Sequence, residues 1–190
     1  MKVCILLYHL DLGGVEKTAV DLANELAAAG HEVDIRTIYK FKPKMFDIDS
    51  RVKVHKFIGK YFKGLNNLVS LLPSSVLYRL IVGNRDYYDI EIAFQAELPT
   101  KIISDSLNFE SKKFAWVHGL GLKYSNVYEN FEKIFFVSKE LLEYNKNNNF
   151  PSELHNKLDI FYNPIDFEEI RTKAGETFTY KGDPNTIRFI

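Results

Sequence analysis

Residues suited to binding an anion or a sugar follow two apolar segments of this sequence. Gly13 and Gly14 come shortly after the apolar run 3–8, and His118 ends the segment KFAWVH. Adjacent glycines let backbone N–H groups approach a ligand, and a helix that begins there favours an anion. A neutral imidazole such as that of His118 hydrogen-bonds a hydroxyl or a phosphate. Both patterns also occur without a ligand, as a strand-to-helix turn and as a structural loop histidine, so the residues alone leave both interpretations open.

Several common catalytic and cofactor-binding patterns are missing from the sequence. The dinucleotide fingerprint needs a third glycine and an acid at the end of the second strand, but that segment ends in Thr37-Ile38-Tyr39. There is no Gly-Lys-Ser/Thr phosphate loop and no G-x-S-x-G elbow, and Ser138 is interpreted as a helix N-cap. Histidines and carboxylates lack metal-ligand spacing, so we expect no metal site.

The elements that position these residues alternate between strands and helices. Expected strands are 3–8, 32–38, 52–58, 89–94, 113–118, 133–137 and 158–162. Expected helices are 16–29, one or two within 64–82 broken near Pro73, 98–107, one after Ser138 and a short one after the segment NPID. This order predicts an α/β fold with a Rossmann-like, doubly wound parallel sheet of six or seven strands.

Ligands bind such sheets at the carboxyl ends of the strands, where the polar residues of this sequence gather. The expected positions there are the glycine pair with the nearby His9, the loop 94–97, His118, Ser138 and Asn163.

Composition limits the class of protein. The chain has 190 residues, 46% of them hydrophobic and 26% charged, with zero formal net charge. These values predict one globular α/β domain and no nucleic-acid partner. Cys4 is the only cysteine, so disulfides and cysteine-rich metal sites are excluded and a reducing compartment is expected. Because the start lacks a signal-peptide pattern and no 18-residue apolar stretch occurs, we expect a cytoplasmic protein.

Charge is concentrated in the segment from Arg36 to Lys63. This segment holds nine Lys or Arg against two Asp, a net charge of +7, and apolar and aromatic residues continue to Leu72. In one interpretation the segment is a solvated face, where the aliphatic parts of lysine side chains cover apolar surface. In the other, it binds anionic lipid. On the second interpretation, residues 36–72 attach the protein peripherally to the cytoplasmic face of a membrane.

Five segments, in order, resemble one family. They are LDLGGVEKTAVDLANELAAAGHEVDI (10–35), YDIEIAFQAELPTKII (88–103), KKFAWVHG (112–119), FEKIFFVSKEL (131–141) and LDIFYNPIDFEEI (158–170). Together they are similar to the N-terminal domain of the GT-B glycosyltransferases of family 4, also called glycosyltransferase group 1. The resemblance spans the chain from Met1 to about Ala174.

The resemblance implies one half of an enzyme with two Rossmann-like domains that face each other across a cleft. Residues 1–178 would form the acceptor-side domain, and 179–190 a linker and the start of a C-terminal donor-binding domain. The enzyme would move a sugar, with retention, from a nucleotide sugar such as a UDP- or GDP-sugar. The acceptor would be a saccharide or lipid-linked saccharide, in bacterial surface polysaccharide assembly. No metal or other cofactor is implied.

The resemblance also assigns roles to individual residues. Gly13 and Gly14 would approach the donor diphosphate. His118 would be the catalytic-site histidine that faces the transferred sugar and positions it. The remaining assignments are Asn163 and Asp166 to substrate binding near the domain junction, and His9 and Glu97 to the acceptor side.

Two features limit the implied activity. Val15-Glu16 follows the glycines where many members have Ala-Glu, which leaves the acceptor open. The basic pair and paired glutamates of the family belong to the second domain, so this chain alone is expected to be inactive. A non-catalytic saccharide-binding module and a sugar-nucleotide epimerase of GT-B fold are the alternative functions.

Overall fold

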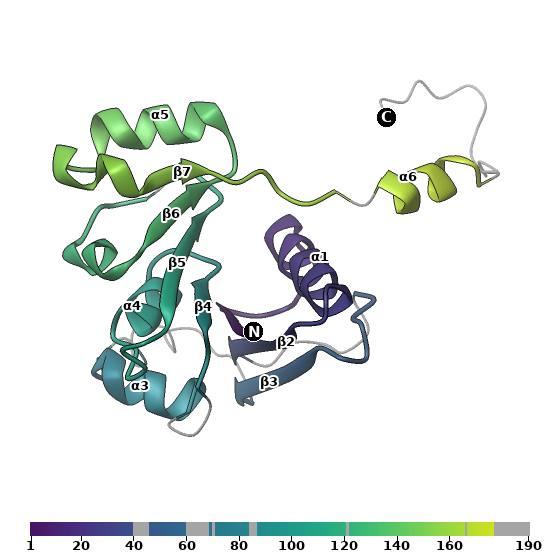
Figure 1. The fold of residues 1–190 in the computed structure, drawn as a ribbon, viewed down its shortest axis with the longest axis horizontal. Helices are drawn as coiled ribbons and strands as arrows, with labels where there is room; N and C mark the ends of the chain where they lie inside the picture. The colour runs from purple at the N-terminus through teal and green to yellow at the C-terminus, as the bar shows by residue number, and fades with distance from the viewer. Residues whose placement is uncertain are drawn as a thin grey trace, which may run out of the picture.

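The protein folds around a parallel β-sheet. The computed structural model describes residues 1–39, 46–59, 69, 71–83, 87–120, 122–165 and 167–176. Within these residues the sheet has seven strands in the order β3-β2-β1-β4-β5-β6-β7, and every neighbouring pair is parallel (Figure 1). The predicted doubly wound parallel sheet is therefore confirmed.

The boundaries of the elements lie close to those expected from the sequence. The strands are β1 (Lys2–Leu7), β2 (Glu32–Tyr39), β3 (Lys53–Ile58), β4 (Ile90–Ala93), β5 (Lys112–Val117), β6 (Lys133–Phe136) and β7 (Leu158–Ile160). The helices are α1 (Gly14–Ala28), α3 (Ser74–Ile81), α4 (Leu98–Ser104), α5 (Lys139–Asn148) and α6 (Phe167–Ala174), with 3₁₀ turns η1 (Asn126–Asn130) and η2 (Ser152–Lys157).

Helix α1 covers one face of the sheet. Ala19, Ala23 and Ala27 recur every four residues and are buried against β1 and β2. Small side chains let the helix pack closely on the sheet. The helix ends at Ala28, and Gly30, two residues later, has a φ of 85° in the left-handed region that favours glycine. There the Gly30 N–H donates to the Ala27 carbonyl and the His31 N–H to the Leu26 carbonyl, which closes the helix.

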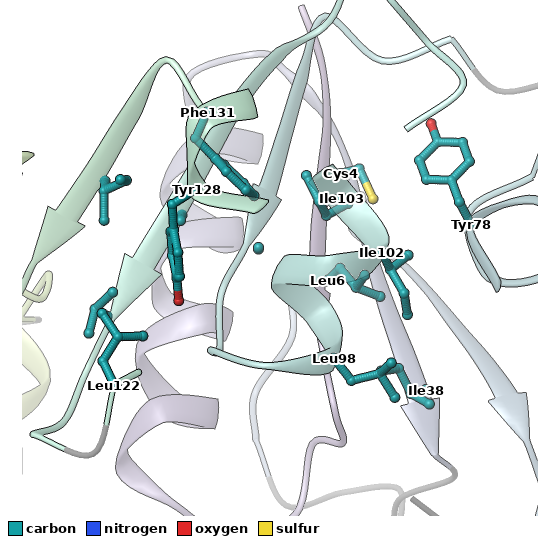
Figure 2. Packing of buried hydrophobic residues seen from close by; sticks show 14 of the residues in the cluster. Cys4, Leu6, Ile38, Tyr78, Leu98, Ile102, Ile103, Leu122, Tyr128 and Phe131 are labelled. Atoms are coloured by element: carbon teal, nitrogen blue, oxygen red, sulfur yellow. The ribbon is translucent and has the colours of Figure 1, made fainter. Parts of the chain in front are cut away.

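The opposite face is covered by α3, α4 and α5. Figure 2 shows part of this core, in which Cys4 and Leu6 of β1 lie near Ile102 and Ile103 of α4. All four side chains are completely buried. Burying an aliphatic side chain of this size contributes about 1.5–3 kcal/mol relative to leaving it exposed. The two covered faces hold the strands, and so the loops at their carboxyl ends, in fixed positions.

Pro73 and Ser138 each precede the start of a helix, as expected from the sequence. Helix α3 begins directly after Pro73, which supports the predicted break near that residue. The Ser138 hydroxyl accepts a hydrogen bond from the Leu141 N–H at 3.2 Å, so the predicted N-cap of α5 is confirmed. Helix α4 ends at Ser104, three residues earlier than expected. The predicted boundary after residue 178 and the linker 179–190 lie outside the described residues.

Buried polar groups anchor α3 to the sheet. The Tyr78 hydroxyl donates to Glu91 of β4, which also accepts from the Ser111 hydroxyl at 2.8 Å. Arg36 of β2 donates to the carbonyl of Ile81 at 3.0 Å and to the Tyr88 hydroxyl at 2.9 Å. Burial, followed by the nearby carboxylate, raises the pKa of Tyr78. These contacts satisfy polar groups that are otherwise costly to bury.

Arg36 therefore does not belong to the basic surface expected from residues 36–63. Its side chain is only 9% exposed and lies 3.6 Å from the Asp34 carboxylate. The sequence pattern groups it with its charged neighbours, but β2 turns it toward the core.

Replacing Tyr78 with Phe tests the anchor. The variant leaves the completely buried Glu91 carboxylate without one donor, so we expect a loss of about 1–3 kcal/mol in unfolding free energy. Urea unfolding followed by circular dichroism measures the loss. The matched control is Tyr87→Phe, because Tyr87 is 75% exposed and should change little. Equal stability of the two variants would contradict a stabilising role for the Tyr78 hydroxyl.

Candidate functional site

The loops at the carboxyl ends of β1, β4 and β5 meet along one edge of the sheet. These strands are neighbours in the order β1-β4-β5, so the glycine pair, the loop 94–97 and His118 follow adjacent strands. Asn163 follows β7, three strands beyond β4. The fold thus places the glycine pair, the loop 94–97, His118 and Asn163 at one edge of the sheet.

A pocket of about 520 Å³ brings three of the predicted residues together. Gly14 lines it from the start of α1, His118 from the end of β5, and Asn163 from the segment after β7. The other lining residues are Val15, Lys17, Thr18, Asp21, Val137, Pro164, Ile165 and Ile170. The pocket is a mainly apolar hollow with a few convergent polar groups, as small-molecule sites are.

Two polar atoms of this pocket have no protein partner. In the part of the chain that the structure describes, His118 Nε2 and Asn163 Oδ1 are buried and form no hydrogen bond. The Trp116 Nε1 beside them is in the same state. Buried polar atoms in native proteins are almost always paired, so unpaired ones in a pocket mark positions that a ligand can satisfy.

The surroundings of His118 keep its imidazole neutral. The ring stacks on Trp116 with centroids 5.9 Å apart and planes at 11°, and its centroid lies 4.8 Å from that of Phe94. Burial disfavours the charged form and lowers the pKa of His118 to about 4. At neutral pH the ring therefore presents one donor and one acceptor rather than a positive charge.

The two glycines have different surroundings. A Cβ at Gly14 would meet no atom within 4 Å, so this position faces the open space of the pocket. A Cβ at Gly13 would lie 2.2 Å from the Glu16 Oε2. Gly13 therefore makes room for a carboxylate of the same chain, and Gly14 is the glycine open to a ligand.

A second, larger pocket of about 1020 Å³ adjoins the first and shares Gly14, Lys17 and Asp21 of α1 with it. It is lined by both glycines, by the loop 46–49 and by Lys173. Lys17 and Asp21 line both pockets and form an ion pair at 2.6 Å. Lys17 thus places a cation beside Gly14, one turn into α1.

The two residues expected on the acceptor side line neither pocket. His9 Nδ1 lies 3.6 Å from Glu16 Oε1 and 3.8 Å from Asp11 Oδ2, and its ring is 41% exposed. Glu97 is exposed at the N-cap of α4. They form a separate group at the same sheet edge, beside the glycine loop.

Glu97 has an unusual backbone conformation. It is the only residue other than glycine with positive φ among those described, with φ 66° and ψ −110°. The Tyr8 hydroxyl accepts from the Leu98 N–H at 3.1 Å. Burial raises the pKa of Tyr8, and the Glu97 carboxylate adds to the rise. A side chain held in this region costs about 1–3 kcal/mol, and such strain is typical of functional sites.

One expected site residue is not described by the structure, and three residues near the site have no role expected from the sequence. Asp166 lies outside the described residues. No group of three or more His, Cys, Asp or Glu within the described ranges is arranged to hold a metal ion. Glu16, Lys17 and Gln95 received no role from the sequence patterns. The only signals for them were the position of Glu16 and Lys17 after the glycines and the polar Gln95 directly after an apolar strand.

Comparison with known proteins establishes the fold. No protein-family model and no curated protein sequence matches this chain. Among solved structures, the apo form of the lipopolysaccharide outer core galactosyltransferase WaaB matches with a TM-score of 0.56 and 14% sequence identity. The match covers 87% of this chain and 46% of that structure, so this chain spans about half its length. The chain has the Rossmann-like fold of one half of a GT-B glycosyltransferase.

Proposed function

We propose that this chain is the acceptor-side half of a retaining glycosyltransferase of family 4 that transfers a sugar from a nucleotide sugar. The observation that carries the proposal is the pair of buried, unpaired atoms, His118 Nε2 and Asn163 Oδ1, in one pocket with Gly14. The likeness to a galactosyltransferase supports the same class of reaction. In this proposal His118 and Asn163 hold the transferred sugar.

The chemistry of the two atoms suits sugar hydroxyls. Asn163 Oδ1 only accepts hydrogen bonds, so its partner must be a donor such as a hydroxyl. His118 is neutral at physiological pH, so it attracts a phosphate less than an imidazolium would. A hydroxyl donates and accepts, and satisfies both atoms. A sugar therefore fits this part of the pocket better than an anion does.

The leaving diphosphate fits the neighbouring part of the pocket. Gly14 leaves open space at the start of α1, where helix N–H groups favour negative charge. Lys17 lines the same space. Groups of this kind stabilise charge that develops on a leaving diphosphate as its bond to the sugar breaks. We propose that a UDP- or GDP-sugar is used in this way, without a metal or other cofactor.

A transfer assay with His118→Ala tests the function. The full-length gene product is incubated with UDP- and GDP-sugars and with saccharide and lipid-linked saccharide acceptors, and the glycosylated product is measured by mass spectrometry. We expect transfer to fall about tenfold or more in His118→Ala, because a hydrogen bond to the sugar is lost. The matched control is His31→Ala, because His31 lies in the loop between α1 and β2.

The pH dependence follows from the neutral imidazole. Because the pKa of His118 is about 4, the ratio of wild-type to His118→Ala rates should stay constant between about pH 6 and pH 8. It should fall as the pH approaches 4, where protonation removes the acceptor nitrogen.

Conversion of the donor sugar without any acceptor would indicate the epimerase. Saccharide binding without donor turnover would indicate the non-catalytic module. Equal transfer by both histidine variants would remove His118 from the site.

Glu97 is the residue that we assign to the acceptor. Its strained backbone persists although glycine would adopt the same φ and ψ without strain, and its carboxylate is exposed at the sheet edge beside the glycine loop. Strain that is retained at an exposed position indicates that the side chain is needed there. An exposed carboxylate accepts hydrogen bonds from acceptor hydroxyls.

Glu97→Gly should separate stability from activity. Relief of strain should raise the unfolding free energy by about 1 kcal/mol, while loss of the carboxylate should lower transfer. The matched control is Glu97→Ala, which removes the carboxylate but keeps a Cβ on the strained backbone. Thermal unfolding and the transfer assay measure the two effects. A Glu97→Gly variant that transfers normally would exclude the side chain from acceptor binding.

We further propose that an anionic membrane surface binds beside α3. Residues 40–45, 60–68 and 70 of the predicted segment 36–72 lie outside the described residues, and of its described charged residues Arg51 is paired with Asp49 at 2.6 Å. Lys53 and Lys56 are exposed on β3, which α3 contacts.

Leu72, Val76 and Leu80 recur every four residues and are 41–52% exposed, although the other side of α3 is buried. Exposed apolar side chains beside lysines suit an anionic lipid surface. No helix among the described residues is long and apolar enough to cross a membrane.

Co-sedimentation with vesicles tests this surface. We expect binding to vesicles that contain phosphatidylglycerol and several-fold weaker binding for Leu80→Asp, because a charge replaces apolar surface that the lipid would cover. The matched control is Leu120→Asp. Leu120 is also exposed, but it follows β5 and is not part of α3. Equal binding to neutral phosphatidylcholine vesicles, or none to either kind, would contradict the proposal.

A further inference from the structure

The candidate site residues form two groups that one side chain connects. Gly14 lies with His118 and Asn163 in the pocket, whereas His9 and Glu97 lie outside it. Gln95, two residues after β4, reaches from the second group to the first turn of α1. A single side chain therefore links the backbone just before His9 to the helix that begins at the pocket residue Gly14.

Gln95 makes two hydrogen bonds of opposite sense. Its Oε1 accepts from the Tyr8 N–H at 2.7 Å, directly after β1. Its Nε2 donates to Glu16 Oε1 at 3.1 Å. An N–H only donates and a carboxylate only accepts, so the two partners require an amide in this orientation. A carboxylate at position 95 would satisfy Tyr8 and repel Glu16.

Glu16 carries the connection into the glycine loop. It lies in the first turn of α1, and its side chain is 8% exposed. Its Oε1 also lies 3.6 Å from His9 Nδ1, and its Oε2 fills the space where Gly13 lacks a Cβ. One carboxylate thus contacts Gln95, His9 and Gly13. Because it is almost completely buried, it has little freedom to adopt another position.

Gln95 is also tied to the loop that holds Glu97. Its carbonyl accepts from the Thr100 hydroxyl of α4 at 3.1 Å, and the Leu98 N–H donates to the Tyr8 hydroxyl. The end of β1, the start of α4 and the first turn of α1 are therefore connected by hydrogen bonds on and around Gln95. A displacement of one of them must break at least one of these bonds.

We propose that Gln95 and Glu16 are positioning residues that hold the acceptor-side group in register with the pocket. They act through His9, the glycine loop and Glu97 rather than by touching the sugar that is transferred. This inference rests on the proposed function for its catalytic consequence. Its structural consequence, a rigid loop 9–14, is independent of that function.

Exchanging the two side chains tests the bridge. Gln95→Glu places two carboxylates together, and Glu16→Gln removes the carboxylate that accepts from Nε2. In the double variant, the amide introduced at position 16 donates to the carboxylate introduced at position 95, so the bond is restored with its sense reversed. We expect amide hydrogen exchange of residues 9–17 to be about tenfold faster in Gln95→Glu and to return close to wild type in the double variant. The matched control is Glu140→Gln, because Glu140 is an exposed acid in the first turn of α5.

Transfer kinetics provide the second readout. In the full-length gene product, Gln95→Glu should raise the KM for the acceptor about tenfold, with a smaller change in the KM for the nucleotide sugar. The double variant should recover most of this loss. A merely structural role would change both KM values together and follow the thermal stability.

Three results would overturn the inference. They are additive effects of the two single substitutions, unchanged exchange of residues 9–17 in Gln95→Glu, and faster exchange with an unchanged acceptor KM. If the wild-type protein transfers no sugar, the proposed function fails together with the catalytic consequence. The exchange data alone then decide whether the bridge holds the loop.

Discussion

The structure depends on the position of β1 between β2 and β4. The chain passes from β1 to β2 on one side and continues from β4 on the other, so the direction of the strand order reverses at the β1-β4 pair. Connections that leave in opposite directions open a crevice at the carboxyl ends of two such strands. The glycine loop follows one of these strands and Gln95 the other. The reversal therefore places the glycine loop beside Gln95, whereas His118 and Asn163 follow β5 and β7 at the same edge of the sheet.

The fold was readable from the sequence because local patterns specify it. Apolar runs of strand length alternate with helical segments, and Ser138 and Gly30 mark helix ends through bonds to residues only three positions away. That alternation predicts a parallel sheet, in which the loops containing Gly14, His118 and Asn163 lie at the same edge. These features need no knowledge of distant contacts.

The parts that escaped prediction depend on distant contacts. Gln95 and Glu16 are 79 positions apart, and nothing near either residue indicates the hydrogen bond between them. Arg36 begins the basic segment of the sequence, yet its partner Tyr88 comes 52 positions later. The strain at Glu97 arises because the chain must turn sharply between β4 and α4, where the residue type gives no warning. Contacts between side chains from different strands depend on the tertiary structure, so local sequence patterns do not predict them.

The stacked pair at the end of β5 has an optical consequence. Trp116 is the only tryptophan of the chain, and its ring lies nearly parallel to that of His118, which lines the pocket. Indole emission responds to the polarity and the charge of its immediate neighbours. All tryptophan fluorescence of this protein therefore originates beside the imidazole, and a molecule entering the pocket changes the emission without any label.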